Sequence, residues 1–346
     1  MPSARRATTP ADLGPAELTP AVFSTAGLAA PRRVELWEAH NASALIGLDV
    51  HAPGPLEATE INVRLPKARI ARVTASAHAV ERTRDVIARC PADSIAIYLA
   101  LRGDAWFTSA DGTHRLRPGQ AVVCATDQPF ARRFAGGFEE LVVTVPCSAL
   151  SGHFDARLAA SLAKPKISLF SASGSASRAG RDAKPGAAAD VSQYARALAR
   201  LAGRATRARQ PVPPDERAIL DLAAVLTSGR EVAPATAHRA AARSYIEEHL
   251  TSPGLGAEQV AAAIGISERQ LSRVFAADGT SVPRHILTRR LCLAYSLLSS
   301  GRPEPETVAD VAARCGFTSA AYFSHAFRQH FGHRASDLRR EAPAPA

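Results

Sequence analysis

The chain has 346 residues, 46% of them hydrophobic, which is enough for two or three domains that each bury a core. Its 42 basic residues exceed its 32 acidic ones, and the formal net charge of +10 favours polyanionic partners. The five cysteines form no CxxC pair, so we expect neither a disulfide framework nor a zinc knuckle. No apolar run reaches membrane length and no signal-peptide core opens the chain. We therefore expect a soluble cytoplasmic protein without a membrane span.

The first 150 residues predict a tail followed by a β domain. Residues 1–20 are rich in Pro, Ala and Thr, and we expect them to be disordered. Residues 32–43 have the apolar spacing of an amphipathic helix with Val34, Trp37 and also Leu36 turned inward. Short segments that alternate in polarity or are β-branched then follow, at 44–50, 60–64, 69–75, 84–88, 94–101, 104–108, 113–116, 121–124, 130–134 and 139–145. Many short strands at this spacing predict an antiparallel sandwich or small barrel over 21–150.

The run at 95–130 resembles a cupin jelly roll, with turn signals at RGD (102–104), ADG (110–112) and RPGQ (117–120). Cupin enzymes hold a metal with an HxH pair, a Glu and a later His, whereas His51, His78, His114 and His153 are each isolated and the sheet region contains no HxH pair. No Gly-rich phosphate loop or nucleophile elbow is present either. We therefore expect no metal site, no cofactor and no catalytic residue, and we expect Cys124 to be a small buried hydrophobe.

Residues 151–238 predict a flexible tract followed by two helices. The tract is rich in Ser, Gly, Ala and Lys. The helices are expected at 190–208 and 214–228, and each carries an apolar stripe, with Tyr194, Leu198 and Leu201 on the first and Ile219, Leu222, Ala223 and Leu226 on the second. These stripes suit packing on the jelly roll or forming a dimer interface, and the two are compatible with each other. Residues 229–238 are expected to be a hinge.

A repeat dominates the C-terminal third of the chain. Residues 260–275 read VAAAIGISERQLSRVF and residues 311–327 read VAARCGFTSAAYFSHAF, with one extra residue after the second Gly. Gly265 and Gly316 stand where a first helix must stop, because Gly adopts the left-handed conformation without steric cost. Ser267 is a suitable N-cap with Gln270 completing a capping box, and Thr318 and Ser319 offer the same cap in the second copy. Each copy therefore predicts a helix–turn–helix unit.

The second helix of each unit has one apolar face and one presented face. Leu271, Val274 and Phe275 form the apolar face of the first, and Phe323, Ala326 and Phe327 form that of the second. The remaining positions point outward: Arg269, Gln270, Ser272 and Arg273 in the first copy, and Ala320, Ala321, Ser324, His325 and Arg328 in the second. Short polar side chains and Arg on a presented helix suit the base edges of a DNA major groove.

Residues 239–340 resemble the DNA-binding domain of the AraC/XylS family of bacterial transcription regulators. The resemblance runs through YIEEHL (245–250), the two units, GTSVPRHILTRRLCLAYSLL (279–298) and FRQHFGHRASDLRR (327–340). It implies that a linker helix at 282–298 joins the units, with Arg290, Leu291 and Ala294 at the family's positions. It also implies that two recognition helices lie about 34 Å apart, one turn of DNA.

The resemblance also implies DNA contacts at individual positions of both units. The expected DNA-binding residues are Ser267, Arg269, Gln270, Ser272, Arg273, Arg290, Ser319, Ala320, Ser324, His325 and Arg328. His325 stands where the family usually has Arg, and Ala335 where it usually has Pro. The first unit is therefore expected to read bases directly, and the second to rely on methyl groups, phosphates and DNA shape. The implied partners are promoter DNA and RNA polymerase, with no membrane.

Residues 23–150 also resemble the sensor domain of one AraC-like subgroup. The shared features are a helix with a central Trp, the pair Arg82-Thr83, the G…DG…L-x-PG-x…PF pattern and Val145-Pro146 after the last strand. They imply a non-catalytic pocket for a small-molecule effector of unknown identity, or a dimerisation module; Arg82, Tyr98 and Trp106 are the candidate pocket residues.

The fold class expected from the sequence is α+β in two domains, an N-terminal antiparallel jelly roll (cupin-like) with flanking helices and a C-terminal all-α domain of two helix–turn–helix units joined by a linker helix. The boundaries are 1–20, 21–150, 151–238, 239–340 and 341–346. The expected function is a DNA-binding transcription regulator, an activator and homodimer by family resemblance. The alternatives are a repressor or nucleoid-type binder, and a cupin-type small-molecule-binding protein or enzyme with a non-functional helical tail.

Overall fold

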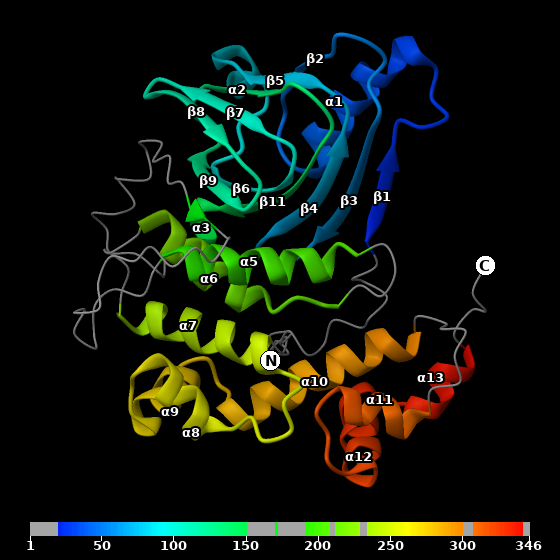
Figure 1. The fold of residues 1–346 in the computed structure, drawn as a ribbon, viewed down its shortest axis with the longest axis vertical. Coiled ribbons are helices and arrows are strands. Elements are labelled where there is room, and N and C mark those ends of the chain that lie inside the picture. Colours follow the sequence, from blue (N-terminus) through cyan, green and yellow to red (C-terminus); the bar gives the residue numbers. More distant parts are fainter. Residues whose placement is uncertain are drawn as a thin grey trace, which may run out of the picture.

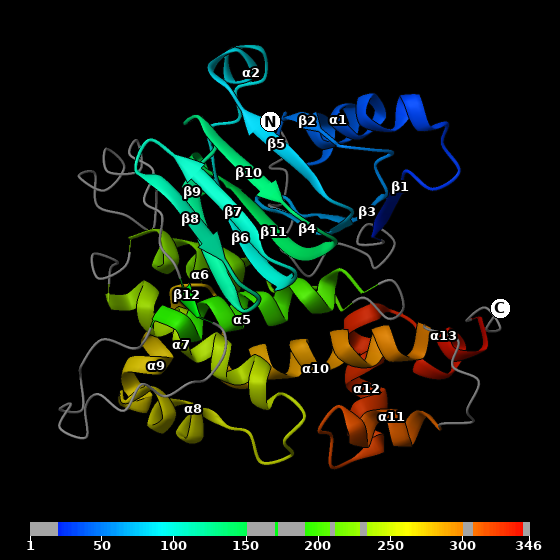
Figure 2. The same ribbon diagram turned by 45° about the horizontal axis from the view of Figure 1, so that its top comes forward.

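The computed structural model describes residues 20–150, 170–171, 191–207, 212–228, 234–299 and 307–341. The expected tails and most of the expected flexible tract at 151–190 lie outside these residues. The described chain forms a β-sandwich, a layer of helices against it, and two helical units at the end of the molecule furthest from the sandwich (Figures 1 and 2).

The sandwich consists of two antiparallel sheets, as the alternating strands predict. The seven-stranded sheet has the order β1 (Ala21–Ser24), β3 (Ala58–Arg64), β4 (Arg69–Ala75), β11 (Phe138–Pro146), β6 (Ser94–Arg102), β9 (Gln120–Ala125) and β12 (Phe170–Ser171). The five-stranded sheet has the order β2 (Asp49–His51), β5 (His78–Arg82), β10 (Phe130–Phe134), β7 (Ala105–Ser109) and β8 (Gly112–Leu116). Most sheet neighbours are distant in sequence, which is the connectivity of a jelly roll.

The seven-stranded sheet is covered on both faces, which explains the nearly continuous apolar runs of β6 and β11. Its inner face contributes Tyr98 and Val142 to the core between the sheets, where Phe107 of β7 and Trp37 of α1 (Arg33–Ala44) also lie. Its outer face contributes Ile97, Leu141 and Val143 to a second core that is shared with helices. A strand that is buried on both sides does not alternate in polarity.

The helices α5 (Val191–Ala205) and α6 (Glu216–Ser228) pack against that outer face (Figure 1). Both predicted apolar stripes are buried there, so the structure confirms packing on the sandwich. Every residue of α6 from Ala218 to Ser228 is buried, which leaves this stretch of the helix no free face for a second copy of the chain. The expected dimer therefore cannot use the α6 stripe.

Helix α7 (Pro234–His249) replaces part of the expected hinge, because residues 234–238 already belong to it and 229–233 lie outside the described residues. Ala240 of α7 extends the core formed by α5, α6 and the sheet, whereas Ala242 and Ile246 belong to the core of the first helix–turn–helix unit. The boundary expected at 238/239 therefore falls inside a helix that both parts of the molecule share.

The strand prediction fails at two places near the start of the sandwich. Residues 84–88 belong to the helix α2 (Arg84–Arg89), because Thr83 Oγ1 accepts the Val86 amide at 3.2 Å and starts a helix. Residues 44–50 are mostly the end of α1 and a loop, and β1 and β5 were not predicted. The remaining short elements are the 3₁₀ helix η3 (Ala30–Arg32) and α3 (Cys147–Leu150). None of the described helices is both long and apolar enough to cross a membrane.

Candidate nucleic-acid interface

The first helix–turn–helix unit consists of α8 (Ala257–Ile264) and α9 (Glu268–Ala276). Gly265 has φ 72°, and the amides of Ile266 and Gly265 donate to the carbonyls of Ala261 and Ala262 at 3.1 and 3.3 Å. This is a Schellman motif, which satisfies the last carbonyls of α8. Ser267 caps α9 by accepting the Gln270 amide at 3.2 Å. The Gln270 side chain contacts His238 instead of completing the expected capping box.

The second unit, α11 (Val308–Arg314) and α12 (Ala320–Phe331), repeats this turn. The amides of Phe317 and Gly316 donate to the carbonyls of Ala312 and Ala313 at 3.0 and 2.9 Å, and Gly316 has φ 85°. Ser319 caps α12 by accepting the Tyr322 amide at 3.2 Å. The expected glycine stops and serine caps are confirmed in both units.

Helix α10 (Val282–Ser299) joins the two units, as the family resemblance implies. Its first half supplies Val282 and Ile286 to the core of the first unit, and its second half supplies Leu291, Ala294 and Leu298 to the core of the second. The predicted apolar faces, Leu271, Val274 and Phe275 on α9 and Phe323, Ala326 and Phe327 on α12, are buried in these cores. α13 (Ala335–Glu341) packs on α10 beside the second unit (Figure 1).

The presented face of α9 matches the prediction. Arg269, Gln270, Ser272 and Arg273 are exposed. Within the described part of the chain, the guanidinium groups of Arg269 and Arg273 make no hydrogen bond or ion pair, so both can bind an external acceptor.

The presented face of α12 carries fewer donors. Ala320, Ala321, Ser324, His325 and Arg328 are exposed as expected, but Ser324 Oγ donates to the Ala320 carbonyl at 2.9 Å. Tyr322 is 55% exposed and was missed by the sequence analysis. Its place directly before Phe323 puts it off the apolar stripe, which is the signal that could have identified it.

Arg290 has a different environment from the one expected. Its Nε and Nη2 donate to the carbonyls of Leu250 and Ser252 at 2.9 and 2.5 Å, just beyond α7. A Cβ atom added at Gly316 would lie 3.0 Å from its guanidinium. Arg290 thus bridges the end of α7 and the turn of the second unit, and we leave it out of the proposed DNA contacts.

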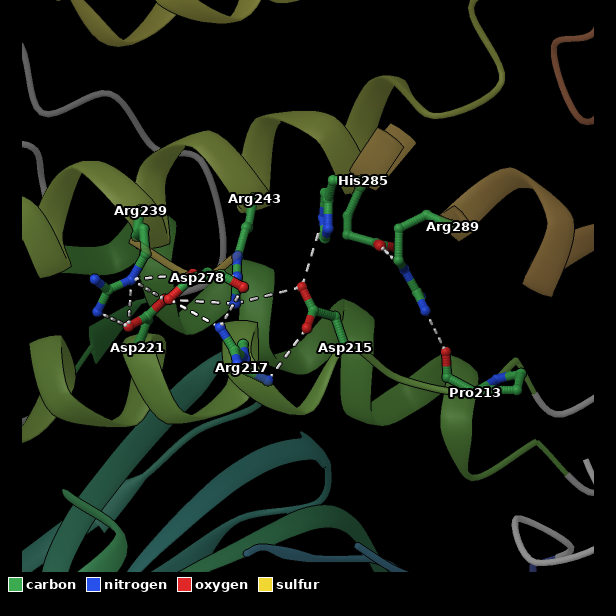
Figure 3. Close-up of polar contacts among 10 residues, drawn as sticks. Pro213, Asp215, Arg217, Asp221, Arg239, Arg243, Asp278, His285 and Arg289 are labelled. Atoms are coloured by element: carbon green, nitrogen blue, oxygen red, sulfur yellow. Dashed lines mark hydrogen bonds and ion pairs between the residues drawn. The ribbon is translucent and has the colours of Figure 1, made fainter. Parts of the chain in front are cut away.

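Buried charges connect α6 to the first unit, and we call Asp215, Asp221, Arg243, Asp278 and His285 the buried charge cluster (Figure 3). Arg243 of α7 is 1% exposed, donates to Asp278 at 2.7 Å and lies 3.6 Å from both Asp215 and Asp221. Asp278 follows α9 by two residues. The cluster therefore fixes the end of the first recognition helix to α6.

Further ion pairs surround this cluster. Arg239 pairs with Asp221, Arg217 of α6 pairs with Asp278 at 3.0 Å, and Arg289 of α10 donates to Glu247 and to the Pro213 carbonyl (Figure 3). Burial alone would raise the pKa of Asp215, but the charges of Arg243, His285 and Arg289 hold it below its ordinary value. These contacts are intramolecular and lie behind the presented face of α9.

The candidate effector residues do not form one site. Arg82 is completely buried, and its donors are taken by the carbonyls of Gly47, Cys90 and Thr126 and by Asp127. Trp106 lies on the outer face of the five-stranded sheet, with Arg115 and Arg133 over its ring. Tyr98 is buried between the sheets. Residue type does not reveal which face of a strand a side chain occupies, so the sequence could not show that these three side chains lie apart.

No group of three His, Cys, Asp or Glu side chains suited to a metal ion occurs among the described residues. Of the isolated histidines considered for a cupin metal site, His153 lies outside them. Cys124 is buried on β9, and burial raises the pKa of its thiol to about 12.

Comparison with known proteins gives two family models in the expected order. Residues 37–252 match an AraC-binding-like domain, which is more than half of the chain, and residues 260–341 match a helix-turn-helix domain. The chain belongs to the AraC family of transcription regulators. The first match ends at 252, so α5, α6 and α7 are included with the sandwich.

This AraC-family chain is 35% identical over 105 residues to the transcriptional activator RhrA of Rhizobium meliloti, 30% of this chain and 33% of that protein. It is 35% identical over 97 residues to the transcriptional activator RhaS of Klebsiella pneumoniae, 28% of this chain and 34% of that protein. The chain thus covers about a third of the length of these relatives. Among solved structures, the AraC-like transcriptional activator CuxR aligns over 80% of this chain and 95% of its own, at 20% identity and a TM-score of 0.45.

Proposed function

We propose that this AraC-family protein is a transcription activator that inserts α9 and α12 into two successive major grooves of promoter DNA. The observation that carries the proposal is the mounting of two helix–turn–helix units, which share the same pattern of glycine-turn hydrogen bonds, on the two halves of α10. A shared helix fixes the spacing of the two recognition helices within one chain. Successive major grooves on one face of B-DNA recur about every 34 Å, and a fixed spacing can match this repeat.

The two recognition helices are assigned different roles. Arg269 and Arg273 are proposed to donate to guanine, and Gln270 and Ser272 to contact neighbouring bases, because Arg forms the commonest specific contact in the major groove. On α12, Ala320 and Tyr322 are proposed to contact thymine methyl groups or sugars, Ser324 and His325 to contact bases or phosphates, and Arg328 to contact phosphate. The capping residues Ser267 and Ser319 lie at the helix N-termini, where phosphates bind.

The partners are proposed from the family. RhrA and RhaS are named as transcriptional activators, and RNA polymerase is the partner that activation requires. Dimerisation and a response to a small-molecule effector are part of the same proposal. The family is one of transcription regulators, which favours a regulator over the enzyme alternative.

Selection of bound duplexes from a random DNA pool, repeated at two salt concentrations, tests this function. We expect enrichment of a motif with two elements about one helical turn apart. Affinity for this motif should fall with salt, because phosphate contacts release counterions, while the preference for the motif remains. Binding without sequence enrichment, lost steeply as salt rises, would contradict the proposal.

A further inference from the structure

Two hollow places in the described part of the sandwich could hold a ligand. The first lies between the sheets beside Tyr98, Arg132 and Glu140, and has a volume of only about 30 Å³, the space of one water molecule. Arg132 and Glu140 are 3% and 5% exposed and pair with each other there through two hydrogen bonds. A ligand would have to break this buried ion pair, so the inner cavity is a poor effector site.

The second is an open groove of about 460 Å³, within the size range of small-molecule sites. It lies where the end of α1, the β3–β4 turn, the segment after α2 and the end of β11 meet. Leu45, Ile46 and Leu65 give it an apolar base, and the hydroxyls of Ser94 and Thr144 lie in its wall. Every lining residue belongs to the described sandwich.

The charge of the groove is one-sided. Its lining includes Arg64, Lys67 and Arg69 and no carboxylate. Arg69 uses one nitrogen on the carbonyls that end α1, at 3.2 to 3.5 Å. Within the described residues, the guanidinium of Arg64 and the ammonium of Lys67 form no ion pair, and both side chains are exposed. Three cations above an apolar base suit an oxyanion carried on a short carbon skeleton.

The turn that carries these cations also contacts α6. The backbone amide of Lys67 donates to Glu216 Oε1, and Glu216 is the first residue of α6. The preceding residue, Asp215, belongs to the buried charge cluster and lies near Arg243 and His285. The β3–β4 turn is therefore connected, through Glu216 and Asp215, to the contacts that fix the end of α9.

We propose that the groove binds a small organic oxyanion, a carboxylate or a phosphate, and that the bound anion acts on the DNA-binding units through Glu216 and Asp215. The anion site stands on the groove alone. The second half rests on the proposed regulatory function, because it supposes that DNA binding is the regulated activity. A ligand that binds one arrangement of the turn more tightly increases the population of that arrangement, and with it one placement of the DNA-binding units. The size of the shift is set by the difference between the ligand's affinities for the two arrangements.

Isothermal titration calorimetry of the full chain tests the site with succinate, inorganic phosphate and neutral succinamide. We expect succinate or phosphate to bind with a Kd below about 1 mM. Succinamide should bind at least about tenfold more weakly, because the cations of the groove attract a negatively charged ligand and not its neutral analogue. Preference for succinate identifies a carboxylate ligand, and preference for phosphate a phosphorylated one. The double variant Arg64→Gln/Lys67→Gln should weaken binding by at least about tenfold, whereas Arg117→Gln, at an exposed turn outside the groove, should leave it unchanged.

The proposed site is refuted if neither anion binds, if succinamide binds equally well, or if the double variant binds as the unchanged chain does. Both substituted side chains are exposed, so the double variant should retain its fold. These measurements contain no DNA, and their failure would leave the DNA-binding function standing.

The connection to DNA is tested by measuring affinity for a selected duplex with and without a saturating concentration of the anion that binds. We expect a change of about fivefold or more, in either direction, matched by an equal change in anion affinity when DNA is present. Glu216→Ala, which lies outside the groove lining, should retain anion binding and lose this change. Anion binding that leaves the DNA affinity unaltered would overturn the second half of the proposal.

Discussion

Arginines in the helical half of the chain fall into two groups with different surroundings. Arg239, Arg243 and Arg289 are paired with carboxylates inside the molecule, whereas Arg269 and Arg273 are exposed on one face of α9. Residues 239–346 contain 13 Arg and 10 acidic residues, so the net charge of this region is small. Recognition therefore depends on which guanidinium groups remain unpaired, and only the structure separates them.

Arg273→Ala is expected to relax base preference at one position of the selected site. A bidentate Arg–guanine contact contributes about 1–3 kcal/mol of discrimination, so the ratio of affinities for the correct and substituted base should fall by about tenfold or more. Titration of matched duplexes by fluorescence anisotropy measures the ratio. Arg117→Ala removes one positive charge from the sandwich and should leave this affinity ratio unchanged. An Arg273→Ala variant with the same affinity ratio as the unchanged chain would refute the role of Arg273 in base reading.

Arg328→Ala is expected to weaken binding to all duplexes by similar factors, because Arg328 is proposed to contact phosphate. The dependence of log affinity on log salt should become shallower by about one unit. Anisotropy titrations at several salt concentrations on selected and scrambled duplexes test this. A loss confined to the selected site would show that Arg328 reads a base.

At the scale of elements, the two glycine turns share one hydrogen-bond pattern but have different neighbours. A side chain at Gly265 would meet no atom within 4 Å, whereas one at Gly316 would meet the Arg290 guanidinium at 3.0 Å. Both glycines have positive φ, which costs other residues about 1–2 kcal/mol.

Gly316→Ala is therefore expected to destabilise the chain more than Gly265→Ala. Both variants carry the strain of a left-handed alanine, but only in Gly316→Ala must the Arg290 guanidinium also shift, which weakens its hydrogen bonds to the carbonyls beyond α7. Urea denaturation followed by far-UV circular dichroism measures this, since both tryptophans, Trp37 and Trp106, lie in the sandwich and do not report on the helical units. Equal losses in the two variants would contradict the bridging role of Arg290.

Elements with a strong local signal could be predicted from the sequence. The glycine stops, the serine caps and the apolar faces of α9 and α12 are local features, and the structure confirms them. The helix α2 was mistaken for a strand, because RDVIA is a short apolar-rich run whose state depends on the Thr83 cap. The roles of Arg82 and Arg290 could not be predicted, because each binds carbonyls that are distant in sequence.

At the scale of the whole molecule, the buried charge cluster is the connection between the sandwich side and the first helix–turn–helix unit. Asp215 and Asp221 come from the α6 region and Arg243 from α7, whereas Asp278 follows α9 and His285 belongs to α10 (Figure 3). These residues are spread over about seventy positions, and no spacing in the sequence indicates that they meet.

Arg243→Met is expected to destabilise the chain by about 3 kcal/mol, because Asp215 loses its nearest arginine, whereas Asp221 and Asp278 keep their pairs with Arg239 and Arg217. The double variant Arg243→Met/Asp215→Asn should recover part of this loss, since the charge that lost its partner is removed. Urea denaturation measures both. If Arg243→Met unfolds at the same urea concentration as the unchanged chain, the cluster does not stabilise the connection.

The contribution of the cluster to the free energy of unfolding is expected to decrease as the pH falls below neutral. Burial lowers the pKa of His285 below its ordinary value of about 6.5, with Arg243 and Arg289 acting in the same direction and Asp215 and Glu247 opposing. The unfolded chain then binds a proton on His285 more readily than the folded chain does. The contribution of His285 to the free energy of unfolding is therefore complete above about pH 6.5, and it is lost as the pH falls through the lower pKa of the folded state. The Asp215 carboxyl, whose pKa is also lowered, stays charged in this range.

Between pH 7 and pH 5, the free energy of unfolding should therefore decrease more steeply in the unchanged chain than in His285→Gln. The comparison of slopes removes the contribution of other histidines, which both chains share. Parallel slopes would show that His285 is not held neutral by its surroundings.

The central claim is that two recognition helices of one chain read two successive major grooves, and changing the spacing of the selected site tests it most directly. Five inserted base pairs between the two elements turn one element to the opposite face of the duplex, about half a helical turn away. We predict that affinity falls to that of a duplex with a single element. Unchanged affinity for the five-pair insertion would show that the two units do not bind together and would contradict the claim.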